Sequence, residues 1–278
     1  MARIGAISTF IKALKNIKAK DGHTLYFRGH ADESWLAHPS IYRHVNNDVN
    51  LPKYVSKEDV LFKSMVANCP EDFLHCESAF DYLVKMQHYG LPTRLLDVTS
   101  NPLVALYFAC NSLNGKDGKH AEVLVYEVPD EEIRFYNSDT VSVISNISKV
   151  SVGFDFQNQR TKFIHEIKNE KPYFLNEIKE EHFNSVVCVK AKLDNKRIVK
   201  QSGAFLLFAM GKDKLNPAEI PDKYLYQYNK GQSELKITQN GKQKILTELA
   251  ELAISEATLF PEIDNVAKYL KEQIKGMI

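Results

Sequence analysis

The chain has 278 residues, of which 44% are hydrophobic, so it can bury a sizeable core. The 36 basic and 35 acidic residues leave a formal net charge of +1, which favours neither a polyanion partner nor a membrane surface. The four cysteines form no C-x-x-C pair, their spacing with histidine fits no zinc pattern, and no apolar run could span a bilayer. We therefore expect one compact cytoplasmic domain with reduced thiols, no metal and no membrane contact.

The chain begins with apolar residues at helical spacing, which predict an amphipathic helix over residues 3–20: Ile4, Ile7, Ile11 and Leu14. Residues 23–30, HTLYFRGH, then predict a short strand that carries Arg28 and Gly29 near its end. A glycine beside a planar, permanently charged guanidinium lets a phosphate or carboxylate approach the backbone closely. The alternative is a surface arginine at a strand end.

The most informative stretch is residues 80–110, FDYLVKMQHYGLPTRLLDVTSNPLVALYFAC. A helix is predicted to stop at Tyr89, because glycine and proline follow at positions 90 and 92. Residues 93–99 predict a buried strand or extended segment. Asn101 as N-cap and Pro102 at the first helical position then begin a second helix, which is apolar nearly all round and typical of a core.

Polar residues gather at the joint between these two helices: Gln87, His88, Thr93, Arg94, Asp97, Thr99, Ser100 and Asn101. Buried polar groups are costly unless they pair with each other or with a ligand. Two interpretations therefore stay open. One is a structural network in which Arg94 bridges to Asp97 or to carbonyl groups at the helix end, and the other is a ligand site.

Elsewhere the patterns predict strands at residues 122–128 and 185–193, and a further strand after a loop within 197–208. Helices are predicted at residues 58–66, 71–89, 160–170, 242–254 and 266–274. Helices come early and late with strands dispersed between them, so the fold class is mixed α+β. Because the chain has no glycine-rich phosphate loop and no G-x-S-x-G elbow, a kinase, a dinucleotide-fold dehydrogenase and a serine hydrolase are disfavoured.

Three segments together resemble the FRG domain family, which is named for a Phe-Arg-Gly motif: YFRG at 26–29, QHYGLPTRLLDVTSNPLVALYFA at 87–109 and QSGAF at 201–205. The resemblance runs from about residue 24 to residue 208 and extends to TLFPEID at 258–264. FRG proteins are bacterial and phage-associated, and the family name carries no established chemistry. The resemblance implies one FRG-type domain over residues 1–278, with an N-terminal helix at 3–20, a core at about 24–208 and a helical C-terminal part at 240–278.

The order of three elements also resembles the arginine-class ADP-ribosyltransferases: Arg28 with Gly29, Thr99 with Ser100 leading into a helix, and Gln201 before an aromatic strand. This resemblance implies an ADP-ribosyltransferase-like split sheet surrounded by helices, with NAD consumed as a substrate. Arg28 would hold the NAD diphosphate and the two hydroxyls would fix the nicotinamide ribose. The aromatic ring of Tyr89 or Tyr42 would stack on nicotinamide. The implied NAD-binding set is Arg28, Gly29, His88, Tyr89, Thr93, Arg94, Thr99 and Ser100.

Position 201 departs from the transferase pattern, which has a catalytic glutamate where this chain has Gln201. An amide can bond a ribose hydroxyl but supplies no negative charge, so Asp97 is the candidate acid beside Gln201 and Arg28 in the catalytic set. One hypothesis is an NAD-dependent enzyme that modifies RNA, DNA or protein, as a toxin or effector in phage defence or beside an antitoxin. The alternative is a non-enzymatic module that binds a nucleotide or nucleic acid on the same scaffold.

Overall fold

A computed structural model describes residues 3–227 and 234–262. Within this part of the chain, seven strands form one sheet in the order β4-β5-β6-β2-β1-β3-β7. Neighbouring strands are antiparallel except for the parallel pair of β4 and β5. The mixed α+β prediction is confirmed. The strands are β1 (His23–His30), β2 (Leu95–Thr99), β3 (Ala121–Pro129), β4 (Arg134–Phe135), β5 (Val186–Lys190), β6 (Gly203–Phe208) and β7 (Glu234–Ile237).

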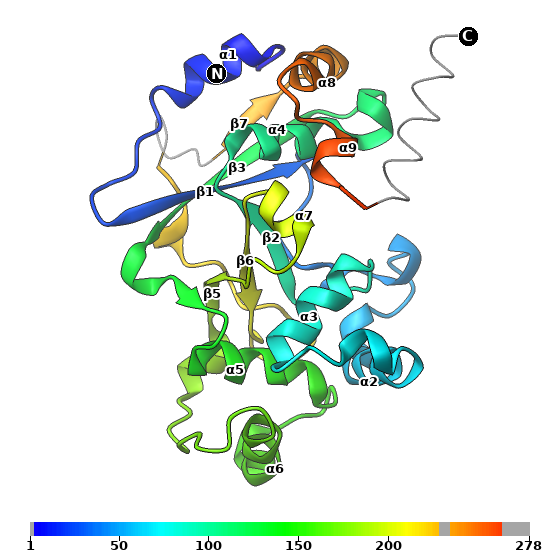
Figure 1. Cartoon of the computed structure of the whole chain (residues 1–278), viewed down its shortest axis with the longest axis vertical. Helices are drawn as coiled ribbons and strands as arrows, with labels where there is room; N and C mark the ends of the chain where they lie inside the picture. The colour runs from blue at the N-terminus through cyan, green and yellow to red at the C-terminus, as the bar shows by residue number, and fades with distance from the viewer. Residues whose placement is uncertain (1–2, 228–233, 263–278) are drawn as a thin grey trace.

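The sheet is narrowest where β1 meets β2. These two strands are joined only at Phe27 and Thr99, whereas β1 is paired with β3 along its whole length. In Figure 1 the two strands run at a wide angle to each other. The sheet therefore consists of two halves, β4-β5-β6-β2 and β1-β3-β7, which diverge beyond one short junction.

Helices cover the two halves as separate groups (Figure 1). Beside β1-β3-β7 lie α1 (Ile7–Leu14), α4 (Pro102–Cys110) and α8 (Lys242–Glu251). Beside the other half lie α2 (Glu58–Asn68), α3 (Ala79–His88), α5 (Asp139–Asn146) and α6 (Phe156–Lys168). Two short helices, α7 (Lys196–Lys200) and α9 (Glu256–Leu259), lie near the junction. No helix in the described ranges is long and apolar enough to cross a membrane.

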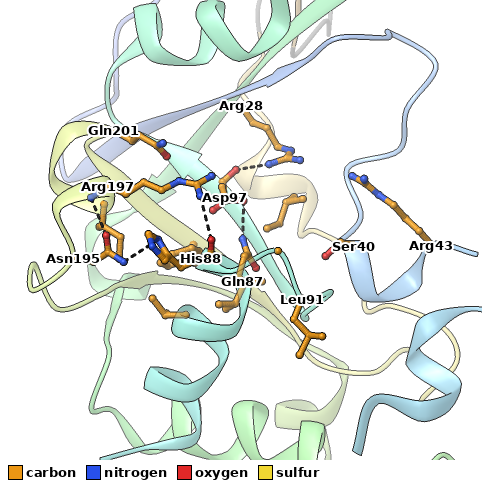
Figure 2. A pocket seen from close by; sticks show the side chains of 16 residues that line it. Arg28, Ser40, Arg43, Gln87, His88, Leu91, Asp97, Asn195, Arg197 and Gln201 are labelled. Atoms are coloured by element: carbon orange, nitrogen blue, oxygen red, sulfur yellow. Dashed lines mark hydrogen bonds between the residues drawn. The ribbon is translucent and has the colours of Figure 1, made fainter. Parts of the chain in front are cut away.

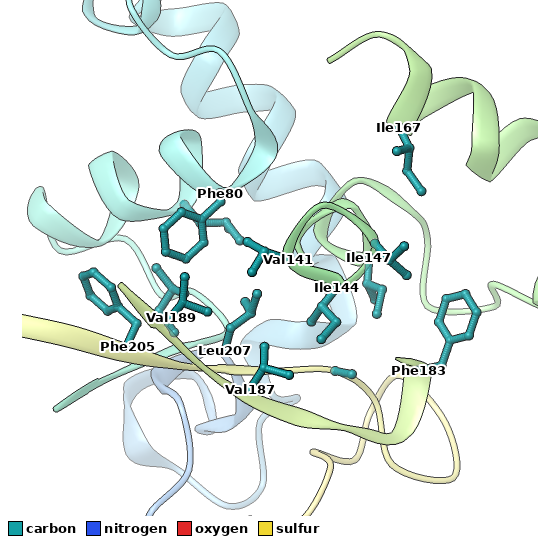
Figure 3. Close-up of a cluster of buried hydrophobic side chains, with 14 of the residues drawn as sticks. Phe80, Val141, Ile144, Ile147, Ile167, Phe183, Val187, Val189, Phe205 and Leu207 are labelled. Atoms are coloured by element: carbon teal, nitrogen blue, oxygen red, sulfur yellow. The ribbon is translucent and has the colours of Figure 1, made fainter. Parts of the chain in front are cut away.

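The buried side chains follow the same division. On one face of the sheet, a single apolar cluster takes residues from both halves, among them Tyr26 and Tyr126 with Val98 and Leu206. On the opposite face there are two clusters, one for each half. Figure 3 shows the cluster of the β5-β6 half, in which Phe80 from α3 and Ile144 from α5 point toward Phe205 and Leu207 of β6, with Val187 and Val189 of β5 beside them. The gap between these two clusters lies over the junction of β1 and β2.

The central stretch folds as predicted. Helix α3 ends with Tyr89 as C-cap, and Gly90 follows with a φ of +83°, a value that glycine adopts without strain. The Asn101 side chain then accepts a hydrogen bond from the amide of Leu103 at 3.0 Å, which caps α4.

Two helices begin later than predicted. The first begins only at Ile7, because Ile4 forms a β-bridge with Ile237 beside β7, and it ends at Leu14 rather than at residue 20. Helix α3 begins after its N-cap Ser78, and residues 70–73 form a separate 3₁₀ turn. The predicted helix at 266–274, and with it part of the expected C-terminal region at 240–278, lies outside the described residues.

Candidate functional site

A cleft lies where β1 and β2 diverge. It consists of two adjoining cavities of about 200 and 240 Å³. Six residues line both cavities: Arg28, Asp97, Arg197, Ile198, Gln201 and Phe205. The first cavity, called here the polar cavity, is lined in addition by Ser40, Arg43, Gln87, His88 and Asn195 (Figure 2). The second, called the apolar cavity, is lined in addition by Phe27, Trp35, Val98, Ala105 and Phe108.

Three arginines give the polar cavity an excess of positive charge. Arg28 donates from Nη1 to the main-chain carbonyl of Asp97 at 2.7 Å, and Arg197 lies 4.5 Å over the Phe260 ring. Arg43 lies 5.9 Å from the centre of the Trp35 ring. Within the described chain, none of the three guanidinium groups forms an ion pair with a carboxylate, in contrast to the arginine at position 94. Guanidinium groups without a protein counter-ion suit an anionic ligand.

Arg28 and Arg43 approach the polar cavity from different walls, and Figure 2 shows their guanidinium groups pointing toward each other. Burial lowers the pKa of Arg28, the charge of Arg43 lowers it further, and the charge of Asp97 opposes the change. An arginine stays protonated in spite of such a shift. The two groups therefore repel each other, and a bound anion would relieve the repulsion.

Asp97 is the only carboxylate that lines either cavity of this cleft among the described residues, and its side chain is exposed. Its Oδ2 accepts a hydrogen bond from Nε2 of Gln87 at 2.7 Å, and the Gln87 Oε1 in turn accepts one from the Thr93 hydroxyl. Asp97 borders both cavities, as Arg28 and Arg197 also do.

A C-terminal strap, residues 259–262, holds three residues of the cleft wall. Gln201 donates from Nε2 to the Leu259 carbonyl at 3.1 Å, and Phe260 packs beneath the guanidinium of Arg197. His88 Nε2 lies 3.5 Å from Oε1 of Glu262. Burial lowers the pKa of His88, although the Glu262 charge opposes this. The strap thereby fixes side chains from two distant parts of the chain, the end of α3 and the α7 segment.

Arg94 and Thr93 have structural roles. Arg94 is fully buried and donates from Nε to Glu58 Oε1 at 2.9 Å and from Nη1 to the Phe208 carbonyl at 2.8 Å. Lys214 adds a second cation 3.0 Å from Glu58 Oε2. The predicted bridge from Arg94 to Asp97 is wrong, because the counter-ion of Arg94 is on α2. Neither Arg94 nor Thr93, which is 1% exposed, lines the cleft, so their expected NAD-binding role is not supported.

Gly29 is required by packing of the protein itself. A Cβ at this position would lie 2.0 Å from the Ala105 carbonyl oxygen and 2.5 Å from the Ala109 amide nitrogen. Helix α4, rather than a ligand, therefore makes the close backbone approach that the sequence indicated at Gly29. The Phe-Arg-Gly motif combines a cleft arginine with a contact that only glycine permits.

The two predicted hydroxyl groups bind backbone. Thr99 donates from Oγ1 to the Gln201 carbonyl at 2.6 Å, and Ser100 lies 3.5 Å from the Ser202 carbonyl. Thr99 borders the apolar cavity, whereas Ser100 lines neither cavity of the cleft. Their observed contacts hold the segment that carries Gln201 against the end of β2.

The predicted stacking residues lie elsewhere. Tyr89 is 60% exposed, packs edge-on against His88 and borders a third cavity outside the cleft. Tyr42 is buried and donates its hydroxyl to the Ala209 carbonyl at 3.0 Å. The aromatic residues that line the apolar cavity are Phe27, Trp35, Phe108 and Phe205.

Sequence reasoning missed several residues of this site. Arg43 and Arg197 lie in segments without clear periodicity, and only the fold brings them to Arg28. His30 does not line the cleft but lies 3.1 Å from Arg28 Nε through its Nε2. It had a local signal, because a residue two positions from Arg28 in the same strand points to the same face. Across the described residues, no group of three or more histidine, cysteine, aspartate or glutamate side chains is placed to bind a metal ion.

Comparison with known families identifies part of this chain. The FRG domain family matches residues 23–118. This part of the chain is an FRG domain. The FRG domain supplies Arg28, Arg43 and Asp97, whereas Arg197 and Gln201 come from outside the matched range. The cleft is thus built from the FRG domain and the segment that follows it. No curated protein and no solved structure matches the chain significantly.

Proposed function

We propose that the cleft binds NAD and that the protein transfers ADP-ribose from NAD to a macromolecule, either nucleic acid or protein. The observation that carries this proposal is that Asp97 borders both the polar cavity, which Arg43 lines, and the apolar cavity, which Trp35 and Phe108 line. The diphosphate would bind Arg28 and Arg43 through charge-assisted hydrogen bonds, and nicotinamide would enter the apolar cavity beside Trp35. The ribose that joins them would then lie next to the Asp97 carboxylate.

In this proposal Asp97 takes the role that glutamate has in the arginine-class transferases. As the bond between nicotinamide and ribose breaks, the electron pair leaves with nicotinamide and positive charge develops on the ribose. A fixed carboxylate beside the ribose stabilises that charge. A nucleophile of the acceptor then attacks the same carbon and loses its proton. We place this activity in a toxin or effector of phage defence, or in a toxin with a partner antitoxin, as the resemblance implies.

A second candidate is a binding module that holds a nucleotide or a nucleic-acid end without reaction. It is favoured by the contacts of Gln201 and Asp97, which already have protein partners. The Gln201 amide donates to the Leu259 carbonyl at 3.1 Å, and one Asp97 oxygen accepts from Gln87 at 2.7 Å. On this view the three arginines are the functional centre and no bond is broken.

The decisive experiment measures nicotinamide released from NAD by the full chain, with and without cell extract. Arg28→Ala is compared with a matched control, Arg134→Ala, because Arg134 also donates from Nη1 to a carbonyl, that of Glu131 at 2.7 Å, but lies on edge strand β4. We expect release that requires extract, is lost in Arg28→Ala and survives in Arg134→Ala. Full release by Arg28→Ala would exclude the assigned role of that residue.

Calorimetry with NAD and ADP-ribose separates the two candidates. Binding without nicotinamide release under any condition would favour the module, because the arginines would then act as a binding site alone. Absence of binding by either compound would contradict the transferase and any module specific for NAD or ADP-ribose.

A further inference from the structure

A row of polar residues crosses three neighbouring strands and ends at Arg28. His30 of β1 faces Glu122 of β3, and Glu122 faces Lys236 of β7 in the strand register. His30 Nδ1 lies 3.2 Å from Glu122 Oε1, and Lys236 Nζ lies 2.8 Å from Glu122 Oε2. His30 and Glu122 are 1% and 5% exposed, so this row is part of the protein interior. The proposed mechanism makes no direct use of it.

The proton position on His30 follows from its two partners. Arg28 Nε lies 3.1 Å from His30 Nε2, and an arginine nitrogen can only donate. His30 Nε2 must therefore carry a lone pair. The proton of the neutral ring is then on Nδ1, where it is donated to the Glu122 carboxylate, which can only accept. Donation therefore runs in one direction, from Arg28 to His30 and from His30 to Glu122.

This arrangement fixes two of the donor nitrogens of Arg28. Nε is held by His30, and Nη1 is held by the main-chain carbonyl of Asp97 at 2.7 Å. Within the described chain, Nη2 has no hydrogen-bond partner. A planar guanidinium held at two nitrogens has its remaining N–H groups pre-oriented, which lowers the entropy lost when an anion binds.

We propose that His30 is a positioning residue for Arg28, and that protonation of His30 breaks this arrangement and weakens binding of a diphosphate ligand. The effect on the ligand rests on the proposed function, whereas the effect on Arg28 does not. A protonated ring would point an N–H group from Nε2 at the N–H group of Arg28 Nε. Two facing donors cannot share a hydrogen bond, and both groups would carry positive charge.

Burial is the main cause that keeps the His30 ring neutral at neutral pH. Burial lowers the pKa of His30, the charges of Arg28 and Arg43 lower it further, and Glu122 raises it through its hydrogen bond and charge. Trp35 contributes no charge on the remaining side, where its ring centre is 6.3 Å from that of His30. The site therefore reaches its binding geometry at neutral pH and loses it in acid.

The first measurement is made on the free protein. Nitrogen-15 NMR of the full chain at about pH 7.5 follows the Arg28 Nε–H signal, assigned by its absence in Arg28→Ala. His30→Gln keeps one acceptor and one donor without a titrating group, whereas His30→Leu removes both. We expect the Arg28 Nε–H to be protected from exchange with water in the native protein and in His30→Gln, and this protection to be lost in His30→Leu. Protection that is unchanged in His30→Leu would overturn the positioning role.

The second measurement is ADP-ribose affinity by calorimetry at about pH 7.5 and about pH 5. We expect about tenfold weaker binding in His30→Leu at the higher pH, since one hydrogen bond to a charged group is lost. Acid should weaken binding by the native protein more than binding by His30→Gln. The control His75→Gln, which removes an exposed histidine, should respond to acid as the native protein does. Equal acid losses in native protein and His30→Gln would overturn the pH dependence, even if His30→Leu does not fold. Absence of ADP-ribose binding with the expected NMR pattern would refute the proposed function and leave the positioning role intact.

Discussion

Arg28 donates to the main-chain carbonyl of Asp97 at 2.7 Å, while the Asp97 carboxylate accepts from Gln87. The two side chains are therefore neighbours without being an ion pair. If Arg28 were bound to the carboxylate, each charge would be neutralised by the other. The observed geometry keeps the cation available for an anion and the carboxylate available for a developing positive charge.

Asp97→Asn should separate binding from chemistry. The amide keeps the size of the side chain but removes its charge, so nicotinamide release should fall about 100-fold or more while ADP-ribose affinity stays within about twofold. Paired kinetic and calorimetric measurements would show this, with the exposed residue change Asp21→Asn as control. Unchanged release would remove Asp97 from the catalytic set.

Gln201→Glu tests whether the residue in the transferase glutamate position is held by structure. A carboxylate would face the Leu259 carbonyl now bound at 3.1 Å by the Gln201 amide, so two acceptors would meet. We expect a loss of about 1–3 kcal/mol in unfolding free energy and faster hydrogen exchange in the strap. If the variant is as stable as the native chain and releases nicotinamide faster, Gln201 is a catalytic position instead.

The buried group of Arg94, Glu58 and Lys214 should behave as a structural unit. Glu58→Gln leaves two buried cations without their counter-charge, so we expect a loss of about 3–5 kcal/mol in urea unfolding. The matched control is Asp59→Asn, which breaks an i,i+4 pair with Lys63 at 3.9 Å on the surface of the same helix and should cost about 0.5 kcal/mol or less. Similar losses in the two variants would contradict this assignment.

Gly29→Ala should destabilise the fold through overpacking. Its Cβ would meet backbone atoms of α4 at 2.0 and 2.5 Å, which a side-chain rotation cannot relieve, so we expect a loss of about 1–3 kcal/mol or more. Gly153→Ala is the control, because a Cβ there has no neighbour within 4 Å. Thermal unfolding of both variants makes the comparison, and a stable Gly29→Ala protein would show that α4 can move away from β1.

The low pKa of His30 also predicts how stability depends on pH. A histidine whose pKa is lower in the folded chain than its ordinary value of 6.5 binds more protons when unfolded. The free energy of unfolding should therefore fall as pH drops below about 6.5, until the folded protein also binds the proton. Urea titrations across this range should show a smaller acid slope in His30→Gln than in the native chain. Identical slopes would mean that His30 does not contribute.

Local signals in the sequence were sufficient for the elements around Gly90 and Asn101. A glycine at positive φ and an N-cap act within a few residues, so a helix, a strand and a second helix could be placed from sequence. Long-range pairing could not be predicted in this way. Glu58 lies 36 residues before Arg94, and a charged residue at the start of a helix is usually solvated rather than a buried counter-ion.

The cleft itself was predictable only in part. Arg28 was found through the Phe-Arg-Gly motif and Asp97 through the polar joint, and the fold places the two on adjacent strands. Arg43 was not, because the irregular segment around it has no periodicity to show which side chains turn inward. In the same segment the large side chains differ in burial, since Trp35 is 50% exposed while Ile41 and Tyr42 are buried.

The short junction between β1 and β2 has a consequence for the backbone. Beyond Phe27 and Thr99 the two strands no longer pair, so an interior position of the sheet presents two strand edges to the cleft. The Asp97 carbonyl, which a continuous ladder would bond to a β1 amide, is bound by the Arg28 side chain instead. A ligand in the cleft therefore meets main-chain donors and acceptors as well as side chains, and part of its recognition is independent of side-chain identity.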